Sequence, residues 1–318
     1  MDIKQLLQKF LNKEGSSDAQ VGLSWDDTGL SMALVSGMLA DTPSVKVLHH
    51  TPWEEGVGRS LVLLGLAKRF DALKVPYVFC MDLDSYSLFP NDAADVPLSE
   101  LAQAMKWAVR DRLDFSVEEA IVDCFFIPDT LRVATQRKVY VAATRKEDVK
   151  KCLEIIRPTR LELKAIEITE LALNNLASFL PESPKGLALL YFPPVGEWGC
   201  LLVCRGGSLF LARRVAAMSA DALELGIDPG RAMASDVQRS LNYAESNFFS
   251  QPVEILYLIA IPETDQLLRH SLTNHLNVRI KTLQLDFLFK GPTPEDPIAF
   301  IHALPALGAA LRSVETTE

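Results

Sequence analysis

Few residues of this 318-residue chain have the types and spacing that carry out chemistry. Residues 27–29 read Asp-Thr-Gly, the catalytic loop of aspartic proteases. Those enzymes pair two facing carboxylates that share a proton, and this sequence contains no second Asp-Thr-Gly or Asp-Ser-Gly. We therefore interpret residues 26–29 as a turn between two strands.

The histidines and cysteines do not predict a metal site. His49 and His50 are neighbours in a predicted strand, so they point to opposite faces and cannot bind one ion together. Cys200 and Cys204 share one face of another strand at a separation of about 13 Å, too far for one metal ion. The five cysteines are scattered, which fits buried thiols in a reducing compartment better than a disulfide framework. With no Ser-His-Asp or Cys-His arrangement either, the sequence predicts no catalytic residue.

Alternating and helical apolar patterns predict strands and helices in an order typical of an α/β protein. In the first part, strands are expected at 20–25, 30–37, 44–50, 75–81, 120–127, 138–143 and 160–168, and helices at 59–72, 97–113, 146–156 and 169–180, with Thr169 as an N-cap. A linker at 181–184 leads to strands at 186–192, 199–205, 208–215, 253–261 and 278–283 and helices at 230–249, 263–275 and 299–312. Gly206 and Gly207 are expected to close a two-residue hairpin.

Residues 2–12 form a candidate amphipathic helix. We interpret it as a terminal helix docked on its own domain, with a contact to a membrane surface or a partner as the alternative.

The composition narrows the location and the partners. Hydrophobic residues make up 48% of the chain and charged residues 23%, which is ordinary for a soluble globular protein. The net charge of −9 argues against a nucleic-acid partner, which requires a basic face. No apolar run reaches the roughly 20 residues of a membrane-spanning helix, and the N-terminal residues lack the apolar segment of a signal peptide. We therefore expect a cytoplasmic protein.

The stretch 96–128 carries the most informative surface residue. Its helix is expected to bury Leu101 and Met105, and at 100° per residue Trp107 points to the opposite side, together with Arg110. A large aromatic side chain on a charged face indicates a contact with another subdomain or another protein. Phe125 and Phe126 follow in a strand, so one of them points away from the helix, where it could line a groove for an extended peptide.

These segments resemble the PilM/MshI family of cytoplasmic proteins that assemble type IV pili, and within it the version that serves the mannose-sensitive haemagglutinin (MSHA) pilus. The resemblance covers nearly the whole chain. Its most specific part is a segment with these residues in order: Pro97, Glu100, Leu101, Trp107, Phe115, Val122 and Asp123. Residues 139–176, 205–215 (RGGSLFLARRV) and 304–312 (LPALGAALR) resemble further segments of the family.

The resemblance implies an actin-like ATPase fold of the α/β class, related to the cell-division protein FtsA. That fold has two ribonuclease-H-like halves and an inserted strand-helix-strand-strand subdomain. The implied ranges are 1–83 for the first part of the first half, 84–145 for the inserted subdomain on that half, 146–181 for the return to it, 182–290 for the second half and 291–318 for a C-terminal helix that packs on the first half.

The resemblance also implies a role as an adaptor. Family members bind the cytoplasmic tail of a PilN-like membrane-anchored partner in a groove beside the inserted subdomain, and so join the inner-membrane complex to the assembly ATPase and the platform protein. We expect the same peripheral attachment to the inner membrane here, with Trp107, Arg110, Phe125 and Phe126 as the partner-binding candidates. A related component of a type II secretion system is an alternative, although such proteins normally carry a membrane span after this domain.

Typical members of the family bind ATP, but the phosphate-binding loops differ here. The family's first loop, Gly-Ile-Asp-x-Gly, becomes residues 22–26, so Ser24 replaces the metal-side carboxylate and Asp26 replaces a glycine. The charge of Asp26 would repel a phosphate. In the second loop Asp-x-Gly becomes residues 191–193, where Tyr191 replaces the aspartate and Pro193 has no N–H to donate.

The nucleoside-binding segment Leu-Ser-Gly-Gly becomes residues 258–261, where Ala260 and Ile261 add side chains at the place of a base and ribose. A shift of register that uses residues 27–29 as the acidic loop would restore neither of the other two loops. We therefore expect a pseudo-ATPase that is not an enzyme and binds neither ATP nor Mg²⁺. An active or regulatory ATP-binding protein of the same machine is the alternative.

Overall fold

The computed structural model describes residues 18–38, 42–128, 137–196, 198–216, 229–249, 251–286 and 288–313. The chain forms two compact units. Unit 1 consists of Met1–Asp82, Cys152–Leu180 and Gln284–Glu318, and unit 2 consists of Leu83–Lys151 and Pro181–Leu283. The chain therefore passes from unit 1 to unit 2 and back twice.

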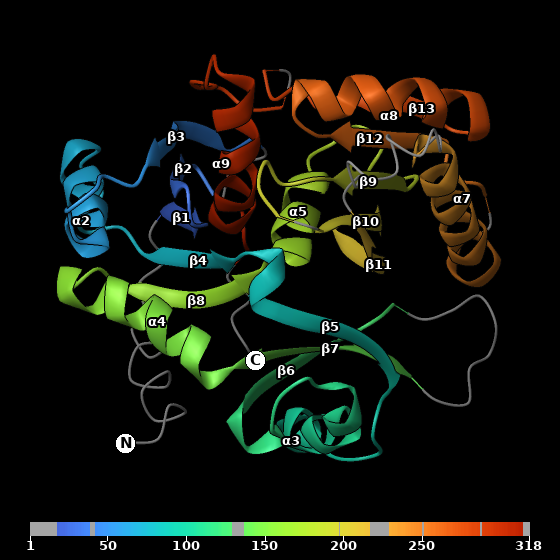
Figure 1. Ribbon diagram of the computed structural model, residues 1–318, viewed down its shortest axis with the longest axis horizontal. Helices are drawn as coiled ribbons and strands as arrows, with labels where there is room; N and C mark the ends of the chain where they lie inside the picture. Colours follow the sequence, from blue (N-terminus) through green and yellow to red (C-terminus); the bar gives the residue numbers. More distant parts are fainter. Residues whose placement is uncertain are drawn as a thin grey trace. The chain divides into compact units, whose positions relative to one another are not determined.

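Unit 1 is built on a five-stranded sheet with the strand order β3-β2-β1-β4-β8 (Figure 1). The first three strands are antiparallel, and β4 and β8 continue the sheet in parallel with β1. The strands are β1 Ala19–Trp25, β2 Gly29–Ser36, β3 Ser44–Pro52, β4 Tyr77–Met81 and β8 Leu163–Ile168. The helices are α2 Arg59–Arg69, α5 Thr169–Ala177 and α9 Pro297–Ala310, and α4 Lys146–Ile156 leads from unit 2 into unit 1.

Helix α9 forms the centre of the core of unit 1. Most of its residues from Ile301 onward are buried, as expected of a helix that is apolar on all sides. It packs on β1, β2 and α5. A Cβ atom on Gly22 of β1 would lie 1.8 Å from the carbonyl oxygen of Ala306, and one on Gly308 would lie 2.0 Å from that of Ala172. These two glycines are therefore required by the close approach of the backbones.

A polar network holds the C-terminal end of α9. The buried Gln20 side chain donates to three of the last carbonyl oxygens of this segment at 3.1 to 3.2 Å. Arg312 pairs with the buried Glu167 of β8, at 3.0 Å between Nη1 and Oε1. Asn175 donates to Glu167 Oε2 and to the carbonyl oxygen of Gly308, both at 3.1 Å. Because the last carbonyls of a helix have no partner within it, these side chains complete the hydrogen bonding there.

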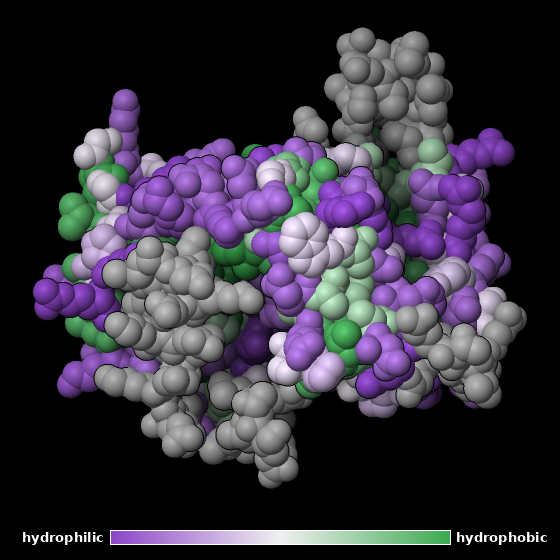
Figure 2. Space-filling view, turned by 90° about the horizontal axis from the view of Figure 1, so that it is seen from below, coloured by the Kyte–Doolittle hydropathy of each residue, from purple (hydrophilic) through white to green (hydrophobic). Residues whose placement is uncertain are grey.

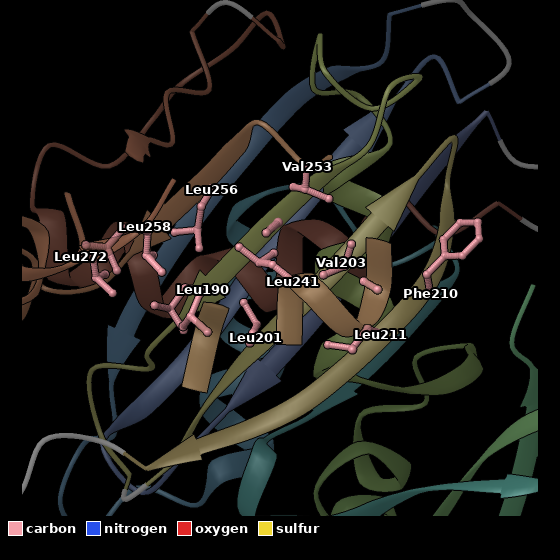
Figure 3. Packing of buried hydrophobic residues seen from close by; sticks show 14 of the residues in the cluster. Leu190, Leu201, Val203, Phe210, Leu211, Leu241, Val253, Leu256, Leu258 and Leu272 are labelled. Carbon is pink, nitrogen blue, oxygen red and sulfur yellow. The ribbon is translucent and has the colours of Figure 1, made fainter. Parts of the chain in front are cut away.

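The larger sheet of unit 2 repeats the topology of unit 1, with the strand order β11-β10-β9-β12-β13. Again three antiparallel strands are followed by two parallel ones. The strands are β9 Leu187–Tyr191, β10 Trp198–Arg205, β11 Ser208–Ala216, β12 Ile255–Ile259 and β13 Arg279–Thr282, and the helices are α7 Pro229–Phe248 and α8 Pro262–His275. Figure 3 shows Leu241 of α7 among Leu190, Leu201 and Val203 of the sheet. This repeated strand order is that of two ribonuclease-H-like halves.

Unit 2 also contains a three-stranded antiparallel sheet of order β5-β7-β6. Its strands are β5 Tyr86–Asp92, β6 Ala120–Phe126 and β7 Lys138–Arg145, and helix α3 Leu98–Ala108 packs on β6 and β7 (Figure 1). On the other face, Tyr140 of β7 belongs to the core of the larger sheet, and its hydroxyl accepts the N–H of Ala212 at 2.8 Å. The strand-helix-strand-strand insertion is therefore confirmed.

Most of the predicted elements are confirmed to within a few residues. The predicted hairpin is present, with Gly206 and Gly207 at φ values of 56° and 79°. The predicted long helix at 230–249 is α7, and the closing helix at 299–312 is α9. The predicted helix at 2–12 lies outside the described residues.

Two expectations differ from the structure. Thr169 is not an N-cap: Ile168 occupies that position, and the Thr169 hydroxyl instead donates to the carbonyl oxygen of Met81 at 2.8 Å. The segment 84–145, expected on the first half, is grouped with the second half, because Tyr140 joins the core of the larger sheet.

None of the described helices is long and apolar enough to cross a membrane. On the face shown in Figure 2, most of the coloured surface is hydrophilic, and hydrophobic residues reach it in small groups. Leu61 on α2 and Trp107 on α3 are among the exposed large apolar side chains of the described surface.

Candidate functional site

Helix α3 presents an exposed tryptophan. The helix begins after Pro97, whose extended backbone occupies the N-cap position, and it buries Leu101 and Met105 against the three-stranded sheet. Trp107 lies on the other side and is 49% exposed, as the helical period predicts. Arg110 follows in a short 3-10 turn, is exposed and pairs with the adjacent Asp111 at 3.2 Å. An aromatic ring and a guanidinium group are thus accessible to a partner on one helical segment.

Phe125 and Phe126 lie on opposite faces of β6, as strand alternation predicts. The ring of Phe126 packs into the cluster under α3, with the guanidinium carbon of Arg137 3.7 Å from its centroid. Phe125 packs on the other face, with its ring centroid 5.6 Å from that of Tyr140. Both phenylalanines therefore contribute to the packing of the subdomain and do not join the exposed pair on α3.

The open edge of the three-stranded sheet was not recognised from the sequence. Strand β6 lies at one edge and pairs with β7. The N–H of Ile127 donates to the carbonyl oxygen of Lys138 at 2.9 Å. In an antiparallel ladder the N–H and C=O groups of successive residues point alternately towards the partner strand and away from it. The backbone groups of Val122, Cys124 and Phe126 therefore point away from β7. Among the described residues, those of Val122 and Phe126 have no hydrogen-bond partner, so this edge can accept another strand.

The opposite edge, formed by β5, is blocked. By the same alternation, the backbone groups of Pro90 and Asp92 on β5 point away from β7. Pro90 has no N–H and its carbonyl oxygen accepts Arg112 Nη1 at 3.2 Å, while the N–H of Asp92 donates to Asn91 Oδ1 at 2.9 Å. Proline and side-chain caps are devices that protect sheet edges. On β6, Asp123 supplies one cap, with its Oδ1 2.8 Å from the N–H of Cys124.

In unit 1, Asp26 stabilises its own turn. Its carboxylate accepts the N–H of Thr28 at 2.7 Å, the Thr28 hydroxyl at 2.5 Å and the N–H of Gly29 at 3.1 Å. It also pairs with Nδ1 of His302 in α9 at 3.0 Å. Burial would raise the pKa of the Asp26 carboxyl, but the hydrogen bonds from His302 and Thr28 outweigh burial and hold that pKa well below its usual range. Ser24 is buried within β1.

His302 stacks on His50, with ring centroids 4.2 Å apart and planes inclined by 9°. Nδ1 of His50 lies 3.0 Å from the hydroxyl of Ser31, which donates to the backbone oxygen of His302 at 3.0 Å. Burial and the ring of His302 lower the pKa of His50 to about 4. Ser31 is only 2% exposed and its hydroxyl is bonded to the backbone, so this group of residues presents no nucleophile. His49 packs on Phe70 instead, as strand alternation predicts.

In unit 2, side chains fill the loop after β9. Tyr191 is the last residue of β9 and is buried. The ring of Phe192 lies so close to Gly199 that a Cβ there would be 2.5 Å from Phe192 Cδ1. Pro193 follows and is half-buried. The loop that carries an aspartate and a glycine in the resembled family therefore carries three ring-bearing residues here.

The segment after β12 also lacks glycine. Ala260 packs against the core cluster of unit 2. Ile261 occupies the N-cap position of α8, and Pro262 lies in its first turn. A proline in the first turn removes one of the N–H groups that a helix N-terminus offers to an anion.

The described residues contain no group of three or more His, Cys, Asp or Glu side chains that could hold a metal ion. Cys200 and Cys204 are buried, as expected. Burial raises the pKa of Cys204, so this thiol is not a reactive nucleophile.

No protein-family model matches the sequence, and no curated protein matches it. A solved structure described as the PilM–PilN type IV pilus biogenesis complex matches with a TM-score of 0.69 and 21% identity, over 92% of this chain and 97% of that one. The cytoplasmic domain of EpsL, an inner-membrane component of the type II secretion system of Vibrio cholerae, matches with a TM-score of 0.48 and 10% identity, over 90% and 94%.

A third solved structure, a protein of unknown function with an actin-like ATPase fold from Bacteroides thetaiotaomicron, has a TM-score of 0.49 and 12% identity, over 86% and 95% of the two chains. The actin-like fold implied by the sequence is confirmed. This chain therefore has an actin-like ATPase fold with two ribonuclease-H-like halves, and it shares that fold over nearly its whole length with a chain of the PilM–PilN complex.

Proposed function

We propose that this protein is a cytoplasmic scaffold of a type IV pilus assembly machine of the MSHA kind. In this role it is held at the inner membrane by the cytoplasmic tail of a PilN-like partner and has the assembly ATPase and the platform protein as further neighbours. The observation that carries the proposal is the likeness to the PilM–PilN structure, with a TM-score of 0.69 over 92% of this chain. Because it covers 92% of this chain, the likeness includes residues of both units.

We assign the tail of the partner to the subdomain formed by β5, β6, β7 and α3. An extended peptide gains main-chain hydrogen bonds by adding a strand to an open sheet edge. The outward groups of Val122 and Phe126 on β6 provide such an edge, whereas Pro90 and its neighbours block the edge of β5. Trp107 and Arg110 on the exposed side of α3 are the side chains that we assign to anchoring, because Trp and Arg dominate binding energy at interfaces.

We further propose that the protein is a pseudo-ATPase. Asp26, which the resemblance aligns with a family glycine, already has its carboxylate bonded to Thr28, Gly29 and His302. Pro193 and Ile261 replace residues at which backbone N–H groups or a small side chain would meet the nucleotide. These features support a scaffold rather than a nucleotide-hydrolysing role.

Fluorescence polarisation with a labelled peptide of the partner's cytoplasmic tail tests the proposal. Trp107→Ala should weaken binding about tenfold or more, as for an interface anchor, and should leave the melting temperature unchanged. Leu98→Ala is the matched control, because Leu98 is 74% exposed on α3 and lies nine residues away, on the other side of the helix. Equal affinities for the wild type and Trp107→Ala would show that Trp107 does not anchor the tail.

A second pair of variants tests the proposed main-chain hydrogen bonds between the tail and β6. Val122→Pro removes an outward N–H from the open edge, and Asp92→Pro removes one from the blocked edge. We expect only Val122→Pro to abolish peptide binding. If both variants bind as the wild type does while Trp107→Ala is impaired, the tail does not add a strand to β6.

A further inference from the structure

One face of helix α2 in unit 1 is exposed and contains leucine, glycine and lysine residues. Leu61 is 65% exposed, Leu64 is half-buried, and Gly65 and Lys68 are exposed, while the opposite face is buried. These four residues occupy positions i, i+3, i+4 and i+7. On a helix, four residues at these positions surround the hole into which a side chain of a facing helix inserts. We call this group of four residues the Gly65 hole.

Packing among the residues that the structure describes does not explain Gly65. A Cβ atom added there would meet nothing within 4 Å, whereas one added at Gly22 or Gly308 would collide with the backbone. A glycine inside a helix is unfavourable relative to alanine, and here alanine would fit without hindrance. The absence of a side chain at Gly65 deepens the hole beside the exposed Leu61. A close approach of another molecule to this face would explain a glycine at this position.

The charges near the hole are complementary to an acidic group. Helix α2 contains Arg59, Lys68 and Arg69 and no acidic residue, in a chain with a net charge of −9. Arg59 lies 4.8 Å from the ring of Trp53 and 3.7 Å from an Asp27 oxygen, and Arg69 lies over a ring as well. Lys68 forms no ion pair among the described residues. A second copy of the same face would bring like charges to this end of the helix.

We propose that the Gly65 hole is the docking site for an amphipathic α-helix of another protein. An apolar side chain of that helix inserts between Leu61, Leu64 and Lys68, and an acidic residue one turn away pairs with Lys68 or Arg69. The site belongs to unit 1 and the proposed tail site to unit 2, so this contact is additional to the proposed function and does not depend on it.

The test begins with a photo-crosslink in cells of the source organism. Leu61→p-benzoylphenylalanine places a probe at the rim of the hole, and mass spectrometry identifies the crosslinked segment. We expect a segment with apolar residues at helical spacing and acidic residues beside them. That segment is then made as a labelled peptide and titrated against the purified full-length chain. No adduct, or an adduct with lipid, with residues 2–12 of this chain or with a second copy of it, overturns the proposal.

Variants decide whether the peptide occupies the hole. Gly65→Leu fills it and should weaken binding at least tenfold, while the melting temperature rises because leucine favours the helix. Gln266→Leu is the control, since it adds an exposed leucine to α8 of unit 2, away from the hole. Lys68→Glu should weaken binding about threefold to tenfold at low salt, and less at high salt. Equal affinity of Gly65→Leu and Gln266→Leu, or loss of tail-peptide binding in Gly65→Leu, overturns the proposal.

Discussion

Glu167 gives unit 1 a stability that depends on pH near neutrality. Its carboxyl group is buried in β8, with Arg312 and Asn175 as partners at 3.0 and 3.1 Å. Burial disfavours the charged form more strongly than these partners favour it, and it raises the pKa of Glu167 to about 7. In the unfolded chain the same group has its ordinary pKa of 4.5.

The sign and size of the effect follow from these two values. Between pH 4.5 and 7 the folded protein holds more protons than the unfolded chain, so the stabilisation is complete below pH 4.5 and is lost as the pH rises to 7. From pH 6 to pH 8.5 the loss amounts to about 1.4 kcal/mol in the free energy of unfolding. Glu167→Gln removes the titration and keeps the shape, so the stability of the variant relative to the wild type should rise by about that amount over this range.

Hydrogen exchange measured by mass spectrometry is the suitable assay, because peptides from β8 and α9 report on the opening of unit 1 alone. Protection is compared at pH 6.0, 7.0 and 8.5 after correction for the intrinsic exchange rate. Glu263→Gln removes the same charge from an exposed position on α8 and serves as the control. A difference between wild type and Glu167→Gln that stays constant over the three pH values would refute this account of Glu167.

Three further predictions concern other parts of the chain. His50 has a pKa of about 4, so lowering the pH from 7 to 5 adds a destabilising contribution of about 1 kcal/mol after allowance for partial exposure, which offsets part of the stabilisation from Glu167. The stability of His50→Gln relative to the wild type should therefore rise by about that amount between pH 7 and 5 in the same exchange assay. Gly308→Ala should destabilise unit 1 by about 3 kcal/mol or more, whereas Gly65→Ala should stabilise it by up to about 1 kcal/mol. Shifts of the same sign in an unfolding titration would contradict one of these two predictions. Mg-ATP at millimolar concentration should leave the melting temperature unchanged, and micromolar binding by calorimetry would mean that the altered loops still hold a nucleotide.

Local patterns were sufficient for most elements of the fold. The spacing of apolar residues placed α7 and α9, and the two glycines at 206 and 207 placed a hairpin that needs positive φ at both positions. The same periodicity put Trp107 on the exposed side of α3 and put Phe125 and Phe126 on opposite faces of β6. These features depend on residues within one element.

Features that depend on distant residues were not predictable from local patterns. Asp26 was predicted as part of a turn, with a charge that would repel a phosphate, whereas its partner His302 lies far away in the chain, on the last described helix. Thr169 has the type of an N-cap, but the carbonyl oxygen of Met81 is close enough to bond its hydroxyl. The open edge of β6 follows from its place in the order β5-β7-β6, and Pro90 was the one local sign that β5 lies at an edge.

The position of α9 has a consequence for the order in which the protein folds during synthesis. Gln20 of β1 bonds a carbonyl oxygen of α9 that lies 289 residues later in the chain. At about 5 to 20 residues per second, the first strand waits about 15 to 60 s for this helix to be made. All residues of unit 2 precede α9, so unit 2 is complete while the sheet of unit 1 still lacks the helix that covers β1 and β2. During that interval the apolar surface that α9 will cover is available to chaperones, and the part of the chain made first becomes the part that folds last.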